Sequence, residues 1–338
     1  MKTKIVITIG IAFAAVVLGI AVGSVYIPPG DVLSIIGHNI FGLNLPEHIT
    51  DGRVAIVWSA RLPRTLLAFI AGSALSVSGA VMQSVLRNPL ASSYTLGVSS
   101  GASLGASLVI FFGVTLPILS IMTLPILGFA FGLGTILIVM VIAKQLDVRM
   151  ENQTIILTGL VFSLFINAIT TLMFALFREN AQRMLLWQMG SFSMRDWHTV
   201  YILAPIAFVG IFIISRFKWE LDVMTFGEEQ AQTIGVNIRR VKLLLLIIAA
   251  ALTGSTIAFV GVIGFVDLVA PHVVRKIFGS THRIIIPMSA VVGGVFMVLA
   301  DIAARTVTAP VELPVGAVTA IIGAPFFAYI YFNKRKAT

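Results

Sequence analysis

Long apolar stretches, each close to the length of a membrane span, alternate with short polar segments along most of the chain. A transmembrane helix needs roughly 20 mostly apolar residues to cross the hydrocarbon core. About ten stretches approach this length, and we predict spans at residues 5–23, 62–83, 94–113, 118–143, 154–177, 199–215, 241–260, 264–278, 284–303 and 315–332. No linker or low-complexity stretch divides them. The pattern therefore predicts an all-α integral membrane protein with a single domain over residues 1–338.

The connection after the first predicted span carries a helical pattern of its own. Asp31 precedes an apolar stripe that includes Val32 and Ile35. An acidic cap followed by apolar residues three or four apart is typical of an amphipathic helix. We predict a helix over about residues 28–42 on the outer surface, and a similar one within residues 178–197.

The longest inner connection, residues 217–241, has apolar residues at helical spacing: Ala231, Ile234, Ile238 and Val241. This spacing predicts a short amphipathic helix. Such a helix either lies flat at the lipid interface or docks into a groove of a cytoplasmic partner. The pattern alone leaves both alternatives open.

Small residues and helix breakers mark two of the predicted spans. Gly97, Gly101 and Gly105 lie four residues apart on one face of the third span, which predicts close packing against a neighbouring helix. Gly264 and Pro271 interrupt the short eighth span. A broken helix either lines a transport pathway or is simply kinked.

The composition excludes a soluble domain with a polar surface, because 58% of the residues are hydrophobic and only 11% are charged. The mean hydropathy of +1.02 agrees. The chain has no cysteine, which excludes disulfides, iron–sulfur clusters and thiolate zinc sites.

The basic residues predict the orientation of the chain in the membrane. If the N-terminus is cytoplasmic, sixteen of the 23 Lys and Arg residues fall on the cytoplasmic side, as the positive-inside tendency requires. Both termini are then cytoplasmic. The net charge of +9 follows from this bias and from attraction to anionic lipid, and it does not indicate nucleic-acid binding.

The sequence lacks the motifs of enzymes and of ATP-binding proteins. It has no phosphate-binding loop, no H-E-x-x-H and no G-x-S-x-G, and its five histidines are scattered. We therefore expect no catalytic site, no metal cluster and no cofactor. Asp267, Asp301 and Arg64 lie near predicted span ends, which argues against an ion-coupled secondary transporter with carboxylates buried in the membrane. That transporter class remains the main alternative, and a membrane-embedded enzyme is a more distant one.

Several segments together resemble the FecCD-type permeases of ABC importers for iron-siderophores, haem and cobalamin. They are RLPR at 61–64, SGAVMQ at 78–83, RNPLA at 87–91, LGVSSGA at 96–102, GFVDLVAPH at 264–272 with Arg275, ADIAAR at 300–305, ELPVG at 312–316 and GAPF at 323–326. The resemblance covers nearly the whole chain. Thr281, before His282 and Arg283, stands where the family usually has Asp, and Asp267 stands where it often has Gly.

The resemblance implies a multi-pass permease subunit in the cell membrane of a bacterium. It would dimerise with an identical or paralogous permease subunit, receive cargo from an extracytoplasmic solute-binding protein and depend on two cytoplasmic ATPase subunits. It would not itself be an enzyme. The cargo it suggests is an iron(III)-siderophore, with haem and cobalamin as alternatives.

The resemblance also implies roles for particular residues. Arg61, Arg64 and Arg305, which the topology places outside, resemble the arginines that pair with acidic residues of the binding protein. The alternative is that they only anchor span ends at lipid headgroups.

The ATPase-coupling positions form one group in the inner loop, and they are Gly227, Glu228, Glu229, Ala231, Ile234 and Gly235. The cytoplasmic-gate positions lie in two other inner loops, and they are Asn88, Pro89, Leu90, Asn152 and Gln153. Ordinary turn formation at Asn-Pro is the competing explanation for the first of these loops.

Overall fold

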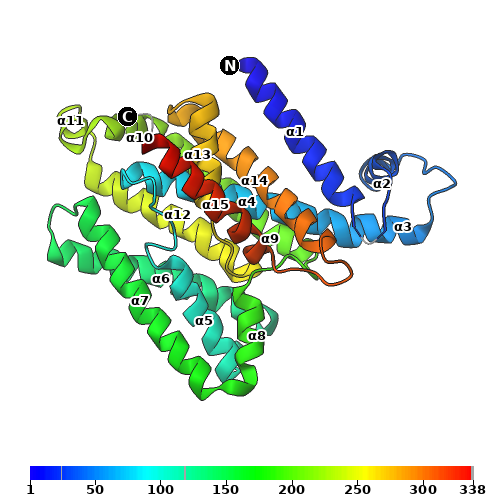
Figure 1. Ribbon diagram of the computed structural model, residues 1–338, viewed down its shortest axis with the longest axis horizontal. Coiled ribbons are helices and arrows are strands. Elements are labelled where there is room, and N and C mark those ends of the chain that lie inside the picture. The colour runs from blue at the N-terminus through cyan, green and yellow to red at the C-terminus, as the bar shows by residue number, and fades with distance from the viewer. Residues whose placement is uncertain (24, 118, 336–338) are drawn as a thin grey trace.

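The structure is a computed structural model that describes residues 1–23, 25–117 and 119–335, and the surroundings of side chains as far as residue 329. Every regular element in these residues is a helix (Figure 1). This confirms the all-α prediction.

Each predicted span corresponds to a helix among the described residues. These helices are α1 (Lys2–Ala21), α4 (Leu62–Val85), α5 (Val98–Phe112), α6 (Thr123–Leu146), α7 (Asn152–Leu176), α9 (Trp197–Arg216), α12 (Ile238–Val260), α13 (Val266–Phe278), α14 (His282–Thr306) and α15 (Val315–Arg335). In the described part of the chain, seven helical segments are long and apolar enough to cross a membrane, and α5 and α15 are shorter apolar helices. The prediction of about ten membrane helices is confirmed.

The remaining helices lie at the two ends of the bundle (Figure 1). They are α2 (Pro29–Phe41), α3 (Asp51–Ala55), the π-helical η1 (Ile56–Arg61), the 3₁₀ turn η2 (Ser120–Met122), α8 (Arg178–Gln188), α10 (Lys218–Phe226) and α11 (Glu228–Thr233). Both ends of the described chain share one side with α10 and α11, whereas α2, α3 and α8 lie on the other side (Figure 1). By the predicted topology the first side carries sixteen of the 23 Lys and Arg residues, and we assign it to the cytoplasm.

Helix α4 runs through the centre of the bundle, and its side chains are buried over most of its length. It packs most closely against α14. A Cβ atom added to Gly72 would lie 2.2 Å from the backbone oxygen of Gly293, so the two backbones meet directly. Ser73 supports this contact by donating a hydrogen bond to the Ala290 carbonyl, at 2.8 Å. Small residues thus let the helices approach, as is common in membrane bundles.

The glycine face predicted for the third span packs as expected. A Cβ atom on Gly101 would lie 2.1 Å from Thr135 Oγ1 of α6, and one on Gly105 would lie 2.4 Å from the Leu127 carbonyl oxygen. Gly97 has a different role. It precedes the first residue of α5 with φ +83°, a left-handed conformation that glycine adopts without strain.

The prediction of one amphipathic helix in the inner connection is wrong, because the apolar residues belong to two helices. Helix α11 ends at Thr233, Gly235 turns the chain with φ +93°, and Ile238 begins α12. Ala231 is fully buried, whereas 60% of Ile234 is exposed. By contrast, α2 at Pro29–Phe41 and α8 at Arg178–Gln188 confirm helices in the two outer connections.

The interruption predicted near the eighth span is a non-helical segment, residues 261–265, between α12 and α13. Phe265 has φ +68°, an unusual conformation for a bulky residue. Pro271 lies inside α13 rather than at its end. Irregular backbone is tolerated at membrane depth only where protein buries it or where it lines a cavity.

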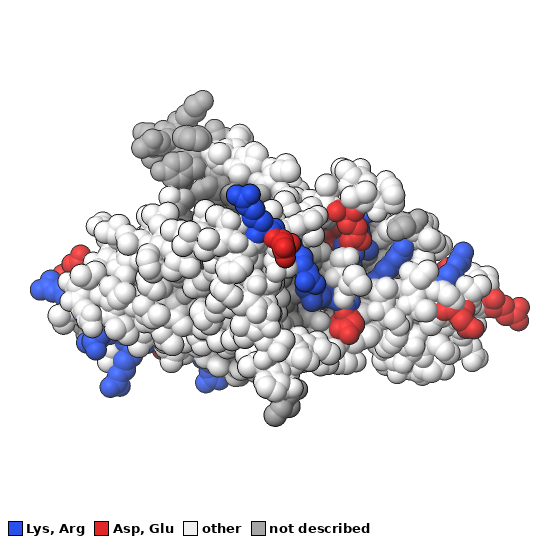
Figure 2. Space-filling model, turned by 90° about the horizontal axis from the view of Figure 1, so that it is seen from below, with Lys and Arg blue, Asp and Glu red and all other residues white. Residues whose placement is uncertain are grey.

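The surface agrees with a lipid environment. In a view from below, charged side chains are sparse and other residues form most of the visible face (Figure 2). Large apolar side chains of α7, including Leu164, Phe165 and Leu172, are exposed in the isolated chain. A soluble protein rarely exposes such a surface, because apolar area in water is unfavourable.

Candidate functional site

The outer end of the bundle contains a compact cluster of charged side chains around Asp301. Arg64 donates hydrogen bonds from Nε and Nη2 to Asp301 Oδ1, at 3.0 and 2.9 Å, and from Nη1 to Glu312 Oε1, at 2.8 Å. Arg305 lies four residues after Asp301 on α14, with its Nε atom 3.3 Å from Asp301 Oδ2. The Asp301 carboxylate, 1% exposed, thus bridges two guanidinium groups. Glu312, in the loop before α15, has its pKa lowered mainly by the hydrogen bond from Arg64.

Arg61 and Arg305 also satisfy the backbone at the end of α1. Arg61 Nη1 donates to the carbonyl oxygens of Ile20 and Ala21, both at 3.0 Å, and Arg305 Nη2 donates to that of Gly19. The last carbonyl groups of a helix have no partner within the helix, and a cation near them also complements the helix dipole. The two arginines therefore fix where α1 meets α4 and α14.

The structure brings the three arginines predicted for docking to one end of the bundle, but it does not leave them free. Arg61 and Arg305 are each 8% exposed and bonded within the chain, and Arg64 already has two carboxylate partners. Their internal partners escaped the sequence reasoning, although the four-residue spacing of Asp301 and Arg305 on one helix was an available signal. A role in docking stays a prediction.

The predicted coupling segment and the predicted gate meet at a buried lysine. Lys242, on the first turns of α12, is 1% exposed. Its Nζ atom lies 2.9 Å from Glu228 Oε1 of α11 and 2.8 Å from Asn152 Oδ1 at the start of α7. A third hydrogen bond, 3.0 Å long, goes to the Met150 carbonyl. In the sequence Lys242 is one of several basic residues of the inner loops, and no local pattern indicates these three partners.

The other coupling positions differ in exposure. Gly227, with φ +138°, and Gly235 flank α11, and Glu229 on the helix is exposed. Ile234 is exposed directly after α11, whereas Ala231 is buried in the core. The exposed residues are therefore the ones that a cytoplasmic partner can reach.

The first gate loop forms a turn at the cytoplasmic end of α4. Asn88 Oδ1 accepts a hydrogen bond from the Leu90 backbone N–H, at 2.9 Å, and the Asn88 carbonyl accepts one from Ala91 N–H, at 3.1 Å. This is the turn chemistry expected of Asn before Pro89. In the second gate loop Gln153 is exposed and Asn152 binds Lys242. The gate function itself stays a prediction.

Asp267 is more deeply placed than the sequence suggested. It lies in the first turn of α13 and is 2% exposed. Thirteen residues of α-helix rise only about 20 Å, less than the roughly 30 Å of a hydrocarbon core. The prediction that Asp267 lies near a span end agrees with its place in the first turn of α13, but its burial by the surrounding protein was not predicted.

Neither carboxylate oxygen of Asp267 has a hydrogen bond of ordinary geometry, although the backbone amides of Ser93 and Leu268 lie within electrostatic reach. Within the part of the chain that the structure describes, no three His, Cys, Asp or Glu side chains are grouped so that they could hold a metal ion. Among the ion pairs of the described residues, none involves Asp267, so its carboxylate faces backbone amides rather than a cation.

Known proteins share both the sequence and the fold of this chain. The model of the FecCD transport family matches residues 11–333. YvrB, an uncharacterized ABC transporter permease protein of Bacillus subtilis (strain 168), is 41% identical over 330 residues, which cover 97% of this chain and 93% of YvrB. The Fe(3+)-citrate import system permease protein YfmE of the same organism is 34% identical over 321 residues, 95% of this chain and 92% of YfmE.

A solved structure described as an inward-facing metal-chelate-type ABC transporter superposes with a TM-score of 0.85. It is 26% identical and covers 98% of this chain and 100% of its own. Relatives in the family are membrane permease subunits, and separate ATPase subunits hydrolyse the ATP. Since the family model spans nearly the whole chain and the fold agrees over 98% of it, this chain belongs to the FecCD transport family.

Proposed function

We propose that this permease subunit translocates an iron(III)-siderophore across the inner membrane of a bacterium. A solute-binding protein delivers the cargo outside, and two ATPase subunits drive the cycle from the cytoplasm. The chain works as a dimer with an identical or paralogous permease subunit. Related permeases are named for Fe(3+)-citrate, hemin and vitamin B12, which supports an iron chelate and keeps haem and cobalamin as alternatives.

The observation that carries the coupling part of this proposal is the bond network of Lys242. One ammonium group holds α11, which can face a cytoplasmic partner, and the start of α7, where the resemblance puts the gate. Because Lys242 is buried, its partners cannot move independently without leaving a charge unsatisfied. Movement of α11 on ATP binding would therefore be transmitted to Asn152.

The charged cluster around Asp301 supports a docking surface for the binding protein at the outer end of the bundle. Arg61 and Arg305 hold the helix ends in position, whereas Arg64 and Glu312 are the cluster members nearest the solvent, with side-chain exposures of 12% and 39%. We propose that the binding protein contacts this surface around the loop before α15. Charges at the rim of a protein interface influence the orientation and the association rate of the partner more than its affinity.

Reconstitution tests the proposal. Liposomes that hold this subunit, its dimer partner and the ATPases should import ⁵⁵Fe-labelled ferric siderophore only with internal ATP and external binding protein. Haem and cobalamin serve as competing cargoes in the same assay. Mass analysis of the complex purified through this subunit identifies the dimer partner. Uptake without the ATPases that collapses on addition of an ionophore would instead identify an ion-coupled carrier.

A further inference from the structure

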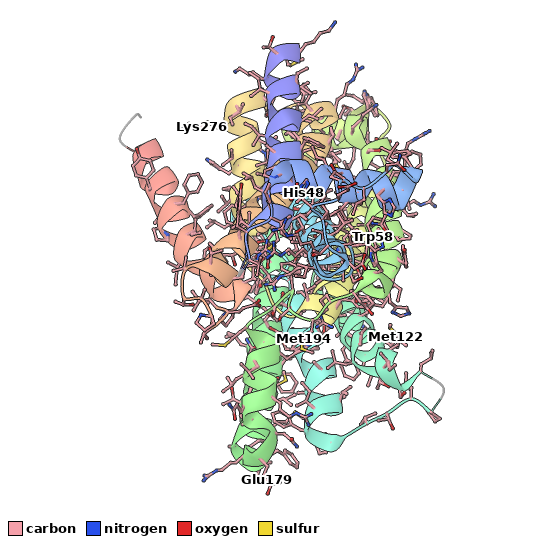
Figure 3. All side chains as sticks on the ribbon, turned by 90° about the vertical axis from the view of Figure 1, so that its right-hand side faces the viewer. His48, Trp58, Met122, Glu179, Met194 and Lys276 are labelled. Carbon is pink, nitrogen blue, oxygen red and sulfur yellow. The ribbon has the colours of Figure 1, made fainter. Side chains whose placement is uncertain are left out.

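A cavity of about 700 Å³ opens at the cytoplasmic end of the bundle, between the ends of α4 and α13 and the start of α14. Its wall includes the cationic side chains of Arg87, Arg275 and Lys276, together with His272 and His282. Among the described residues that line it there is no Asp or Glu. Lys276 lies on the same side of the molecule as the start of α1 (Figure 3).

Arg275 is held in this wall by neutral acceptors alone. Its guanidinium donates to Gln83 Oε1, to the Ala80 carbonyl at 3.2 Å and to Ser84 Oγ at 3.3 Å. Among the ion pairs of the described residues, none involves Arg275, Arg87 or Lys276. A half-buried guanidinium without a counter-ion has lost part of its hydration and is not compensated by an opposite charge, so binding of an anion would be favourable.

Asp222 is held by His282, one of the residues that line the cavity. Asp222 Oδ1 accepts hydrogen bonds from the His282 backbone N–H, at 2.8 Å, and lies 2.7 Å from His282 Nδ1. The other ring nitrogen, Nε2, lies 2.7 Å from Ser84 Oγ. These contacts hold Ser84 and His282 in place, and among the ion pairs of the described residues Asp222 contacts His282 and none of the three cations.

We infer that this cavity is a binding site for an oxyanion group, a carboxylate or a phosphate. Guanidinium and ammonium groups bind such anions through charge-assisted hydrogen bonds. Asn88 and Pro89 of the predicted gate loop also line the cavity, so an anion bound there sits beside the proposed exit. This inference rests on the proposed function. If the occupant is the cargo, the site restricts the cargo to chelates that carry carboxylate or similar anionic groups.

Two sources can supply the oxyanion: an anionic iron chelate that leaves the pathway, and a phospholipid headgroup of the inner leaflet. The full-length permease is placed in nanodiscs of phosphatidylcholine, and binding of citrate, ferric citrate and inorganic phosphate is measured by calorimetry. A parallel series uses phosphatidylglycerol nanodiscs. Loss of citrate binding in phosphatidylglycerol identifies the headgroup as the occupant, whereas equal binding in both lipids identifies the soluble anion.

Charge removal locates the site. Arg87→Gln and Lys276→Gln change exposed side chains, and each should weaken citrate binding about tenfold, the effect expected for one charge-assisted contact. Arg239→Gln, an exposed cation on the same side but outside the cavity, is the matched control and should bind like the wild type. Arg275→Gln should abolish binding and Arg275→Lys should restore part of it.

The inference is overturned if no anion binds in either lipid, or if the cavity variants and the control bind alike. Binding requires neither ATP nor the partner subunits, so the two proposals fail separately. Anion binding without ATP-driven import would reject the proposed function alone. Import of a chelate by a permease whose cavity variants retain full anion affinity would reject the site alone.

Discussion

The Nζ atom of Lys242 lies 2.9 Å from Oε1 of Glu228, and the lysine is buried. The two residues lie on α12 and α11, which are joined by a turn at Gly235. The same atom binds Asn152, 90 residues away in the chain. A buried ammonium group depends on its partners, because removing one leaves an unsatisfied charge. Lys242 therefore links α11 to the start of α7, so a displacement of one helix would disturb the contacts of the other.

We expect Glu228→Gln to loosen this link. The variant should lose about 1–3 kcal/mol of stability, because the ammonium group keeps only neutral acceptors. In reconstituted complexes, more ATP should be hydrolysed for each cargo molecule imported. Glu229→Gln, which alters the exposed neighbour, is the control. If the two variants have the same melting temperature and the same coupling ratio, Lys242 does not transmit motion.

Ala231 and Ile234 should separate folding from docking. Ala231→Glu places a charge in the packed core and should lower the melting temperature of the isolated permease. Ile234→Glu alters an exposed side chain and should leave that temperature unchanged while reducing the amount of ATPase that copurifies. Equal copurification of ATPase with wild type and Ile234→Glu would show that the turn after α11 is not part of the docking surface.

Arg64 and Asp301 should be strongly interdependent. Arg64→Met leaves a buried carboxylate with fewer partners and should cost about 3–5 kcal/mol, the usual range for breaking a buried ion pair. Asp301→Asn in the Arg64→Met background should recover part of this loss, since it removes the uncompensated charge. Thermal unfolding of the four proteins of the double-mutant cycle measures the coupling. Additive effects would contradict the network.

The order and number of the membrane helices could be predicted because apolar length is a local property of the sequence. The close packing of Gly101 and Gly105 was predictable for the same reason, since both lie on one helix face. The division at Gly235 was not predicted, because Ile238 and Val241 continue the apolar spacing of Ala231 across a turn.

The candidate site was only partly predictable. Outward-facing arginines follow from topology, but the partners of Arg61 are carbonyl groups about 40 residues away, which no local pattern encodes. The same holds for Arg64 and Asp301, which are 237 residues apart. Burial of Asp267 depends on the packing of α13 against α4, where a Cβ atom on Gly79 would lie 2.0 Å from the Asp267 backbone oxygen, and such a contact between distant segments is not a local pattern.

Acid should weaken the contribution of Glu312 to stability. Its pKa is lowered in the folded chain, mainly by the hydrogen bond from Arg64, so folding favours the ionised form. Because the pKa of Glu312 is lower in the folded chain, its contribution to stability is complete above the pKa of the unfolded chain, about 4.3. That contribution is lost as the pH falls through the pKa of the folded chain. The difference in melting temperature between wild type and Glu312→Gln should be constant above about pH 5 and should shrink below it. A difference that grows on acidification would contradict this ion pair.

Asp267 allows the energy source to be tested within the chain itself. A carrier coupled to protons or sodium ions needs a carboxylate that binds the ion at membrane depth, and Asp267 is the described residue that best fits this requirement. In an ATP-driven permease the same residue is dispensable for energy coupling.

Asp267→Asn keeps the size of the side chain and removes a buried charge, so it should fold at least as stably as the wild type. We expect the variant to retain ATP-dependent import at an initial rate within about twofold of the wild type, with or without ionophores, since a twofold change is less than 0.5 kcal/mol. Import that is abolished by Asp267→Asn in a correctly inserted complex, and abolished in the wild type by dissipating the ion gradients, would establish ion coupling through this residue.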